Sequence, residues 1–323
     1  MRFACTVSDL NAGLATVTRA LATRSASPIL EGVLLETCPE GLRLLCTDLA
    51  LGIETHVDAQ VEEDGRVVLP GKLLTEIIRK LPAERVSVSI NATHTASIRC
   101  AGSRTTIAGL SANEYPELPE VEGEPALSLP QNQWKKMIQT TCFAIATDET
   151  RPILTGCLLE TEKDELHMVA LDGFRLAMQK YATKTPETPI TAVVPGKMLT
   201  ELGKILTDTT EPVELRLSAS HLVADIGPTR VVTRLLEGEF IRYHQILPAD
   251  YQTQIQVSCK ALETAIDRAS LIAREGKNNL VRFHIEEQSL LITSNAELGD
   301  VREELPIQSE GRDLDIAFNV RYI

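Results

Sequence analysis

The side chains in this sequence that could carry out chemistry are few and widely spaced. No histidine has a second histidine three or four residues away, and the six stand at positions 56, 94, 167, 221, 244 and 284. Helices that bind metals or carry catalytic histidines use this spacing, and it is absent here. Each histidine is therefore better explained as a surface or strand residue. The seven cysteines, at 5, 38, 46, 100, 142, 157 and 259, include no Cys-x-x-Cys pair. An odd, unclustered set is typical of buried reduced thiols in a cytosolic protein, not of a disulfide framework or a zinc site.

The fragment Pro-Gly-Lys, at 70–72 and again at 195–197, resembles part of a phosphate-binding loop. It lacks the required upstream glycine, and Leu73 or Met198 stands where Ser or Thr would hold magnesium. The start of a helix after Pro-Gly explains the fragment better. The sequence also contains no GxSxG, HExxH or GxGxxG motif. We therefore predict no catalytic residue, no bound metal and no cofactor.

The composition narrows the class of protein. A chain of 323 residues has room for two or three domains. Aromatic residues make up only 4%, which disfavours a protein that grips single strands by base stacking. The net charge of −13 argues against a simple DNA-binding domain, so any contact with DNA must use a local basic surface or topology. With no signal-like N-terminus and no long apolar stretch, we expect a cytoplasmic protein that has no membrane partner.

The strongest signal is an internal repeat. Residues 27–37 and 151–161 are identical at eight of eleven positions, and residues 70–76 and 195–201 at six of seven. The offsets of 124 and 125 residues are nearly constant, so the matches indicate a duplication. A fainter third copy begins near residue 258. Three periods would need roughly 370 residues, so we expect roughly 45 residues of the third copy to be missing, with its second helix and last strands among them.

Two aspartates recur in this repeat. Asp48 and Asp172 stand 124 residues apart. Recurring carboxylates can indicate acid–base catalysis. Aspartate also closes turns by accepting hydrogen bonds from nearby backbone NH groups. The third copy carries Asn295 at this position, and asparagine can hold a turn but cannot act as a base. We therefore predict a turn role.

Each full copy is predicted to be an α+β unit of about eight strands and two helices, with antiparallel sheets because the connections are short. In the first copy, Ser8 is a good N-cap for a helix through about Ala22, and a second helix is expected over 71–81. These patterns predict three tandem domains at 1–119, 120–248 and 249–323, the third of them incomplete.

Basic residues recur on the predicted helices. Lys72 and Arg79 are seven residues apart, as are Lys197 and Lys204, so each pair lies on one helix face. For any single lysine, a solvated face without function is an equally good explanation. The recurrence in two copies favours contact with phosphates of duplex DNA, which gives affinity without sequence reading. The candidate DNA-binding residues are Arg19, Arg24, Lys72, Arg79, Lys135, Lys136, Lys197, Lys204, Arg268 and Arg274.

In order and spacing, the whole chain resembles the bacterial DNA polymerase III beta subunit, the processivity clamp. The stretches that carry the resemblance are PILEGVLLE, TDLAL, RPILTGCLLE, ALDGFRLAM, EGEFIRYHQILP and IAFNVRYI. The resemblance implies a sliding clamp without enzymatic activity, a head-to-tail homodimer that forms a closed ring around duplex DNA. Its implied partners are the DNA polymerase III catalytic subunit, the clamp loader and other proteins with clamp-binding motifs.

The resemblance also implies two protein-binding surfaces. In the dimer interface, Leu271, Ile272, Glu297, Asp300, Glu303 and Glu304 would face Arg99 and Arg104 in the first domain of a second copy. A pocket for partner peptides would be formed by Leu154, Leu171, Gly173, Phe174, Arg175 and Leu176 with Ile241, Gln245 and Ile246. The family's C-terminal residues complete this pocket, and this sequence is expected to lack them.

Two other interpretations stay open at this point. One is a truncated or degraded clamp that cannot close the ring or bind partner peptides. The other is an unrelated enzyme built on duplicated α+β units, against which the absent catalytic motifs count. The molar mass in solution separates an intact clamp from a degraded one, because a closed ring requires a dimer.

Overall fold

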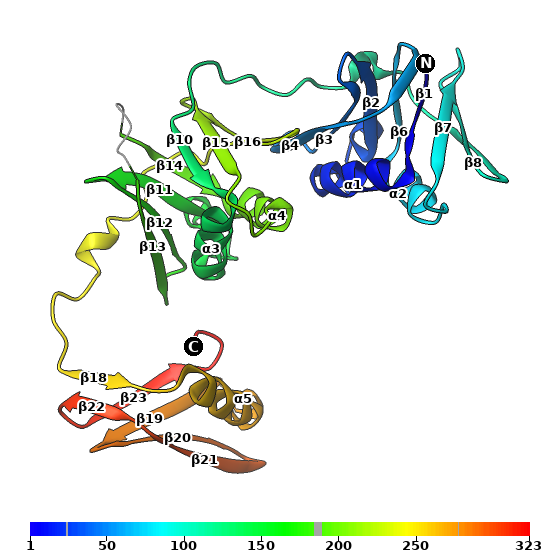
Figure 1. The fold of residues 1–323 in the computed structure, drawn as a ribbon. Coiled ribbons are helices and arrows are strands. Elements are labelled where there is room, and N and C mark those ends of the chain that lie inside the picture. Colours follow the sequence, from blue (N-terminus) through cyan, green and yellow to red (C-terminus); the bar gives the residue numbers. More distant parts are fainter. Residues whose placement is uncertain (24, 184–188, 277) are drawn as a thin grey trace. The chain divides into compact units, whose positions relative to one another are not determined.

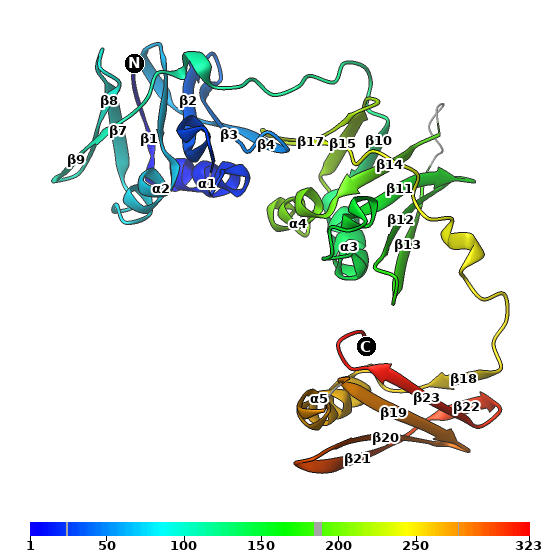
Figure 2. The same ribbon diagram turned by 180° about the vertical axis from the view of Figure 1, so that it is seen from behind.

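The computed structural model divides into two compact units, Met1–Phe240 (unit 1) and Ile241–Ile323 (unit 2), and Figures 1 and 2 show both. The described residues are 1–23, 25–183, 189–276 and 278–323. Every strand pairing among them is antiparallel, and the predicted α+β class is confirmed. None of the helices in these ranges has the length and apolar character needed to cross a membrane. The expected domain boundaries stay a prediction.

Unit 1 contains the first two copies of the repeat. The first consists of β1 (Arg2–Thr6), α1 (Val7–Val17), β2 (Gly32–Cys38), β3 (Gly41–Thr47), β4 (Leu51–Val57), β5 (Gln60–Glu63), β6 (Arg66–Pro70), α2 (Gly71–Arg79), β7 (Arg85–Ile90), β8 (Thr95–Cys100) and β9 (Ser103–Ala108). The second consists of β10 (Leu127–Pro130), α3 (Gln131–Thr141), β11 (Gly156–Glu162), β12 (Glu165–Leu171), β13 (Leu176–Ala182), β14 (Thr191–Pro195), α4 (Gly196–Ile205), β15 (Pro212–Leu217), β16 (His221–Ile226) and β17 (Thr229–Arg234). Apart from β5, which has no counterpart among the described residues of the second copy, the order of strands and α-helices repeats, as the sequence predicts.

The first helix begins and ends differently from the prediction. Thr6, not Ser8, caps α1, and its Oγ1 accepts a hydrogen bond from Asp9 N at 3.1 Å. The α-helix ends at Val17 and a single 3-10 turn, η1 (Thr18–Ala20), follows. Because Leu21 then takes up an extended conformation, the predicted continuation to Ala22 is wrong.

One sheet runs through both repeats of unit 1. Its eight strands follow the order β10-β15-β16-β17-β4-β3-β2-β6, and the pairing of β17 with β4 joins the second repeat to the first. A buried hydrogen bond of 2.8 Å between Thr55 Oγ1 and Thr229 Oγ1 crosses this pairing. Helices α1 and α2 contact each other, as do α3 and α4. Apolar side chains at helical spacing, such as Leu10 and Leu14 in α1, are fully buried in the core of this unit.

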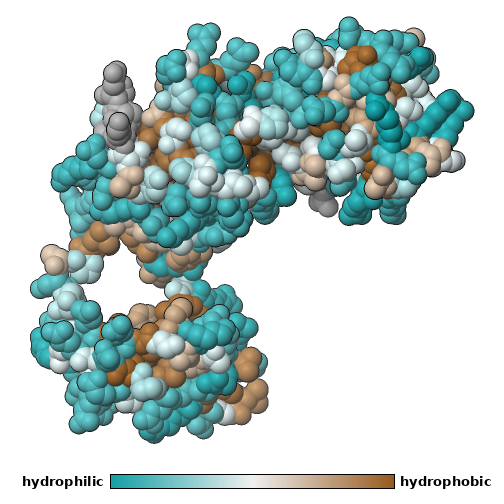
Figure 3. All heavy atoms as spheres, in the orientation of Figure 1, coloured by the Kyte–Doolittle hydropathy of each residue, from teal (hydrophilic) through white to brown (hydrophobic). Residues whose placement is uncertain are grey.

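Unit 2 has one α-helix among its described residues. Its elements are η6 (Tyr243–Gln245), β18 (Thr253–Gln256), α5 (Cys259–Glu275), β19 (Leu280–Glu286), β20 (Ser289–Ala296), β21 (Gly299–Pro306), β22 (Gln308–Gly311) and β23 (Leu314–Asn319). Helix α5 packs on β19, β20 and β21 through a face of alanines, and these small side chains bring the helix close to the sheet. Figure 3 shows apolar residues at the surface of unit 2, and Leu280, Leu314 and Ile316 are each about two-fifths exposed.

Candidate binding surfaces

The basic residues predicted on α2 are fully available to a ligand. Lys72 and Arg79 are both exposed, and they form no ion pair with any described residue. Lys136 on α3 and Arg274 in the last turn of α5 are also exposed. Point charges presented in this way suit phosphate groups. Arg24, which was predicted with them, lies outside the described residues.

Three other predicted residues lie at the junction between the two repeats. On α4, Lys197 forms an ion pair with Asp48 in the β3–β4 turn. Arg19 in η1 lies 3.2 Å from Glu201 of α4, which also pairs with Lys204 at 2.7 Å. These contacts link residues that are 149 and 182 positions apart. Arg19 and Lys197 therefore help to hold the first repeat against the second, in addition to any role toward DNA.

The two acidic partners at this junction are held ionised. Burial works against the charge of Glu201, yet hydrogen bonds from Lys204 and Arg19 lower the pKa of that carboxyl overall. The pKa of Asp48 is likewise lowered, because hydrogen bonds from Lys197 and from the backbone NH groups of Leu51 and Ala50 outweigh the effect of burial. Sequence reasoning did not identify Glu201 as an interface residue.

The remaining basic residues have acidic partners within their own repeats. Lys135 lies 3.2 Å from Asp208. Arg268 on α5 holds Glu303 of β21 through two hydrogen bonds, at 2.7 and 2.5 Å. Arg268 was predicted to bind DNA, and Glu303 was predicted to lie in the dimer interface. The Arg268 guanidinium lowers the pKa of the Glu303 carboxyl.

The recurring aspartates close turns, as predicted. Oδ1 of Asp48 accepts hydrogen bonds from Ala50 N and Leu51 N, at 3.0 and 2.8 Å. Oδ1 of Asp172 accepts the same pair from Phe174 N and Arg175 N, at 3.0 and 3.1 Å. The duplicated geometry explains why this residue type recurs without any catalytic role.

Six of the predicted pocket residues belong to unit 1. The β12–β13 turn carries Gly173, with a φ of +89°, and Phe174, whose side chain is 78% exposed. Arg175 lies 5.4 Å from the ring centroid of Phe143, and its Nε donates to Asp172 at 3.0 Å. Leu176 is half-buried next to this turn. The turn thus offers an exposed aromatic ring beside an ordered guanidinium.

The other members of the predicted pocket differ in exposure. Leu154, in η5 (Pro152–Thr155), and Leu171 are almost fully buried, so they can only form a floor. Ile241, Gln245 and Ile246 belong to unit 2, where Ile246 is 57% exposed and Gln245 ends the short helix η6 (Tyr243–Gln245).

The residues predicted for a dimer interface lie at two sheet edges. β9 is the last strand of a five-stranded sheet ordered β5-β1-β7-β8-β9, and Arg104 on it is paired with Arg99 on β8. In unit 2, β21 is the outer strand of the sheet β21-β20-β19-β23, and it carries Asp300, Glu303 and Glu304. One edge is therefore basic and the other acidic.

The other three residues predicted for the dimer interface also belong to unit 2. Leu271 on α5 is 65% exposed, Ile272 is half-buried, and Glu297 is exposed in the β20–β21 turn.

The junction between the repeats pairs the two strands of unit 1 that correspond to these edges. By its place in the repeat, β9 corresponds to β17, since Arg104 matches Arg230 at an offset of 126. Strand β21 corresponds to β4, because each follows the hairpin strand of its own copy. In unit 1, β4 and β17 pair directly, and Arg230 Nη1 lies 3.7 Å from Glu54 Oε1 across that pairing.

The strand registers identify the residue that matches Glu54. Glu54 stands opposite Leu45 of β3, and Glu303 stands opposite Ile292 of β20. Leu45 and Ile292 are 247 positions apart, as are the turn residues Asp48 and Asn295. Glu303 therefore occupies in the third copy the place that Glu54 occupies in the first.

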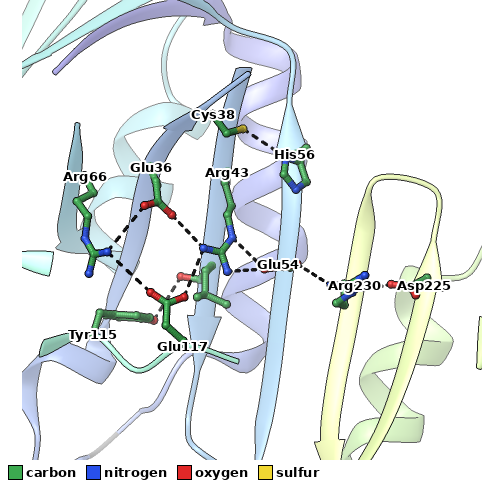
Figure 4. A network of polar contacts seen from close by, with 11 residues as sticks. Glu36, Cys38, Arg43, Glu54, His56, Arg66, Tyr115, Glu117, Asp225 and Arg230 are labelled. Carbon is green, nitrogen blue, oxygen red and sulfur yellow. Dashed lines mark hydrogen bonds and ion pairs between the residues drawn. The ribbon is translucent and has the colours of Figure 1, made fainter. Parts of the chain in front are cut away.

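Figure 4 shows how Glu54 is held in this junction. Arg43 donates to Glu54 at 2.7 and 2.9 Å and to Glu36 at 2.9 Å, while Arg230 also binds Asp225 at 2.8 Å. Glu54 is buried, and the alternating charges across the sheet compensate one another, so its carboxylate carries little uncompensated charge. Sequence reasoning missed Glu54, because its match with Glu303 follows from the strand registers: the constant offset of 247 would pair Glu54 with Val301 instead.

Comparison with known proteins assigns the whole chain to the family that the sequence resembles. Models of the DNA polymerase III beta subunit match in order, the N-terminal domain over residues 1–119, the central domain over 128–241 and the C-terminal domain over 244–323. The beta sliding clamp of Bacillus subtilis is 34% identical over 335 aligned residues, which cover 100% of this chain and 89% of the relative. That of Staphylococcus epidermidis is 33% identical over 315 residues, which cover 94% and 84%.

Solved structures are equally similar. The DNA polymerase sliding clamp from Bacillus subtilis superposes with a TM-score of 0.95 at 34% identity, over 99% of this chain and 88% of that one. The beta subunit from the DNA polymerase of Streptococcus pyogenes superposes with a TM-score of 0.94 at 28% identity, over 99% and 88%. This chain therefore belongs to the family of DNA polymerase III beta subunits, the beta sliding clamps.

Proposed function

We propose that this chain is the sliding clamp of a replication machinery, a processivity factor that encircles duplex DNA and tethers the polymerase. Its family is not catalytic, and the function lies in the assembly of the chain around its ligand. The observation that carries the ring is the β4–β17 junction inside unit 1.

A second copy can repeat this junction between chains. The free basic edge at β9 and the free acidic edge at β21 correspond to the two strands that already pair in unit 1. Two copies joined head to tail through β21 and β9 would use this heterologous contact twice and leave neither edge open. Arg104 of one copy would then face Glu303 of the other, in the way that Arg230 faces Glu54.

The contact with DNA would be made by the helices. Exposed Lys72 and Arg79 on α2, with Lys136, Lys197 and Lys204 on α3 and α4, form a local basic surface on a chain of net charge −13. The overall field repels phosphate, so affinity for open duplex should be low at physiological salt. A closed ring does not depend on that affinity, because topology holds it on the DNA. A cytoplasmic location goes with this role.

Partner proteins would bind at the β12–β13 turn. A short peptide with apolar side chains can anchor against Phe174 and Leu176, with Leu154 and Leu171 beneath, while Arg175 offers hydrogen bonds. The partners of this class are the polymerase catalytic subunit, the clamp loader and other proteins that carry a clamp-binding motif.

The test of this function uses topology. The full chain is loaded on nicked circular DNA with a bacterial clamp loader and ATP, the salt is raised, and the circle is then cut. A ring stays on the circle at high salt and leaves once the DNA is linear, because salt screens phosphate contacts but does not open a threaded ring. Equally fast release from circular and linear DNA at every salt concentration would refute the proposal.

A further inference from the structure

Three side chains of different chemistry meet at one corner of the first repeat, and none of them is among the residues predicted for DNA, for the dimer interface or for the peptide pocket. Cys38, Glu40 and His56 each offer one ligand atom, and these three atoms all lie within 4.8 Å of one another. Cys38 Sγ lies 3.5 Å from His56 Nδ1, and Figure 4 shows the two side chains pointing toward each other. Neither the spacing of the cysteines nor that of the histidines indicates this cluster.

Strand pairing brings the three residues together. Cys38 ends β2 and is paired with Gly41 of β3, while Arg43, two residues further along β3, is paired with His56 of β4. Residues directly opposite each other share a face of the sheet, as do residues two apart on a strand, so Cys38 and His56 lie on the same face.

Gly41 lets the β2–β3 turn lie close to the end of β4. Its φ is +122°, and a Cβ there would lie only 2.6 Å from Val57 O and 2.8 Å from Ala59 N, so no other residue suits this position well. Glu40 stands in the turn just before it and is exposed, so one side of the cluster is open to water.

The donor set suits a thiophilic divalent cation. Zinc takes cysteine sulfur, histidine nitrogen and carboxylate oxygen in tetrahedral sites, and a site with three protein ligands keeps a fourth position for water. Zinc–sulfur and zinc–nitrogen bonds of about 2.3 and 2.0 Å place the two ligand atoms about 3.5 Å apart in a tetrahedron. This is the separation of Cys38 Sγ and His56 Nδ1.

The charges around the cluster do not oppose a cation. Arg43 is the nearest guanidinium along the strand register, but Glu36 and Glu54 hold it at 2.9 and 2.7 Å and compensate its charge. Glu40 adds a further carboxylate that forms no ion pair with another described residue, and the chain as a whole is acidic.

We propose that Cys38, Glu40 and His56 form a binding site for a thiophilic divalent cation, with Zn²⁺ as its ligand and water in the fourth position. A bound ion would fasten the β2–β3 hairpin to β4, the strand that carries the junction with the second repeat. His56 already contributes to that junction, since its backbone NH donates to Pro228 O at 3.2 Å. Because a thiol binds a metal ion as thiolate, binding would release a proton.

Cobalt and zinc ions provide the test. The full chain, reduced and freed of metal by a chelator, is titrated with Co²⁺, and the thiolate-to-cobalt charge-transfer absorption is recorded before Zn²⁺ is added as a competitor. The wild type is expected to saturate at one equivalent, and Zn²⁺ to remove the band. Cys38→Ser should abolish the band. Substitution of a residue that only supports a metal ligand lowers metal affinity by roughly tenfold to 100-fold. His56→Ala removes a ligand itself, so it should lower the affinity for cobalt by more than that.

Cys259→Ser is the matched control, because Cys259 is the exposed cysteine of the chain and lies on α5. This variant should bind cobalt as the wild type does. Zn²⁺ should also raise the Tm of the wild type and of Cys259→Ser but not that of Cys38→Ser, whose metal-free melting curve reports whether it folds. A wild type without the band, a band that survives Cys38→Ser, or a band that disappears in Cys259→Ser would each overturn the proposal.

Discussion

Arg230 on β17 and Glu54 on β4 form an ion pair of 3.7 Å across the strand pairing that joins the second repeat to the first. The same two places in the repeat are filled by Arg104 on β9 and Glu303 on β21, each at a free edge. The strand-to-strand contact is therefore present once within unit 1, and the strands that correspond to it are outer strands of their sheets. The proposed dimer would use them in the same way, which would connect the duplicated sequence to the ring.

Reversing the charge of Glu303 should weaken the dimer. Glu303→Lys would face Arg104 of the second copy, and close charge pairs across interfaces couple by roughly 1.5–7 kcal/mol. The dimer dissociation constant is expected to rise at least about tenfold. Analytical ultracentrifugation over a concentration series measures it. Combining the change with Arg104→Glu should restore much of the affinity, and Glu287→Lys, at an exposed turn, is the control. A dimer unaffected by Glu303→Lys would place the interface elsewhere.

The turn role of Asp48 can be separated from its charge. Asp48→Ala removes two backbone hydrogen bonds and the partner of Lys197, so the free energy of unfolding of unit 1 should fall by about 1–3 kcal/mol. Asp48→Asn keeps the turn acceptor, as Asn295 can in the third copy, and its free energy of unfolding should fall by less. Urea unfolding followed by circular dichroism gives both values. Equal decreases would mean that the ion pair, not the turn, accounts for the effect.

Stability at acid pH should depend on Glu201. Its pKa is lowered in the folded chain, because hydrogen bonds from Lys204 and Arg19 outweigh its burial. A lowered carboxyl pKa stabilises the fold above the ordinary value of 4.5, and this contribution disappears as the pH falls through the lowered pKa. Glu201→Gln should therefore reduce the free energy of unfolding by about 0.5–1 kcal/mol near pH 7 and flatten its fall below pH 4.5.

Denaturant melts between pH 3 and 7 test this expectation, with Glu237→Gln, at an exposed position, as the control. Parallel pH profiles for wild type and Glu201→Gln would contradict it.

The sequence predicted what repeats locally and missed what depends on distant pairing. Helical spacing located α1 and α2 because apolar residues such as Leu10 and Leu14 face one core, but the N-cap moved to Thr6 because that hydroxyl reaches Asp9 N. The duplication identified the turn role of Asp48 and Asp172. The partners of Arg19 and Lys197 could not be found in this way, since they lie 182 and 149 residues away.

The Cys38 and His56 cluster was missed for a related reason. These residues are 18 positions apart, and only the registers of β2, β3 and β4 bring them together. Metal ligands at helical or Cys-x-x-Cys spacing are close in the sequence, whereas this cluster takes its side chains from β2, the β2–β3 turn and β4.

Peptide binding should depend on the exposed side of the β12–β13 turn. Phe174→Ala removes a side chain that is 78% exposed, and Leu176→Ala shortens one beside it. Because neither change removes a fully buried side chain, each should weaken binding of a labelled polymerase-tail peptide at least about tenfold while the Tm stays within a few degrees. Leu110→Ala, at a half-exposed leucine of the first repeat, is the control. Fluorescence anisotropy curves that are identical for all four proteins would exclude this turn as the docking site.

Charge reversal on α2 should reduce binding to DNA without opening the ring. Lys72→Glu with Arg79→Glu replaces two exposed cations that have no partner among the described residues, so the effect on folding should be small. Removing one phosphate-binding cation lowers the dependence of log affinity on log salt by about one, so the double variant should bind open duplex more weakly and with a shallower salt slope. Lys163→Glu, at a side chain 87% exposed in the β11–β12 turn, is the matched control.

Once loaded on a circle, the double variant should still be retained at high salt, because retention needs only a closed ring. Release from the circle at the rate seen on linear DNA would show that these residues help to keep the ring closed.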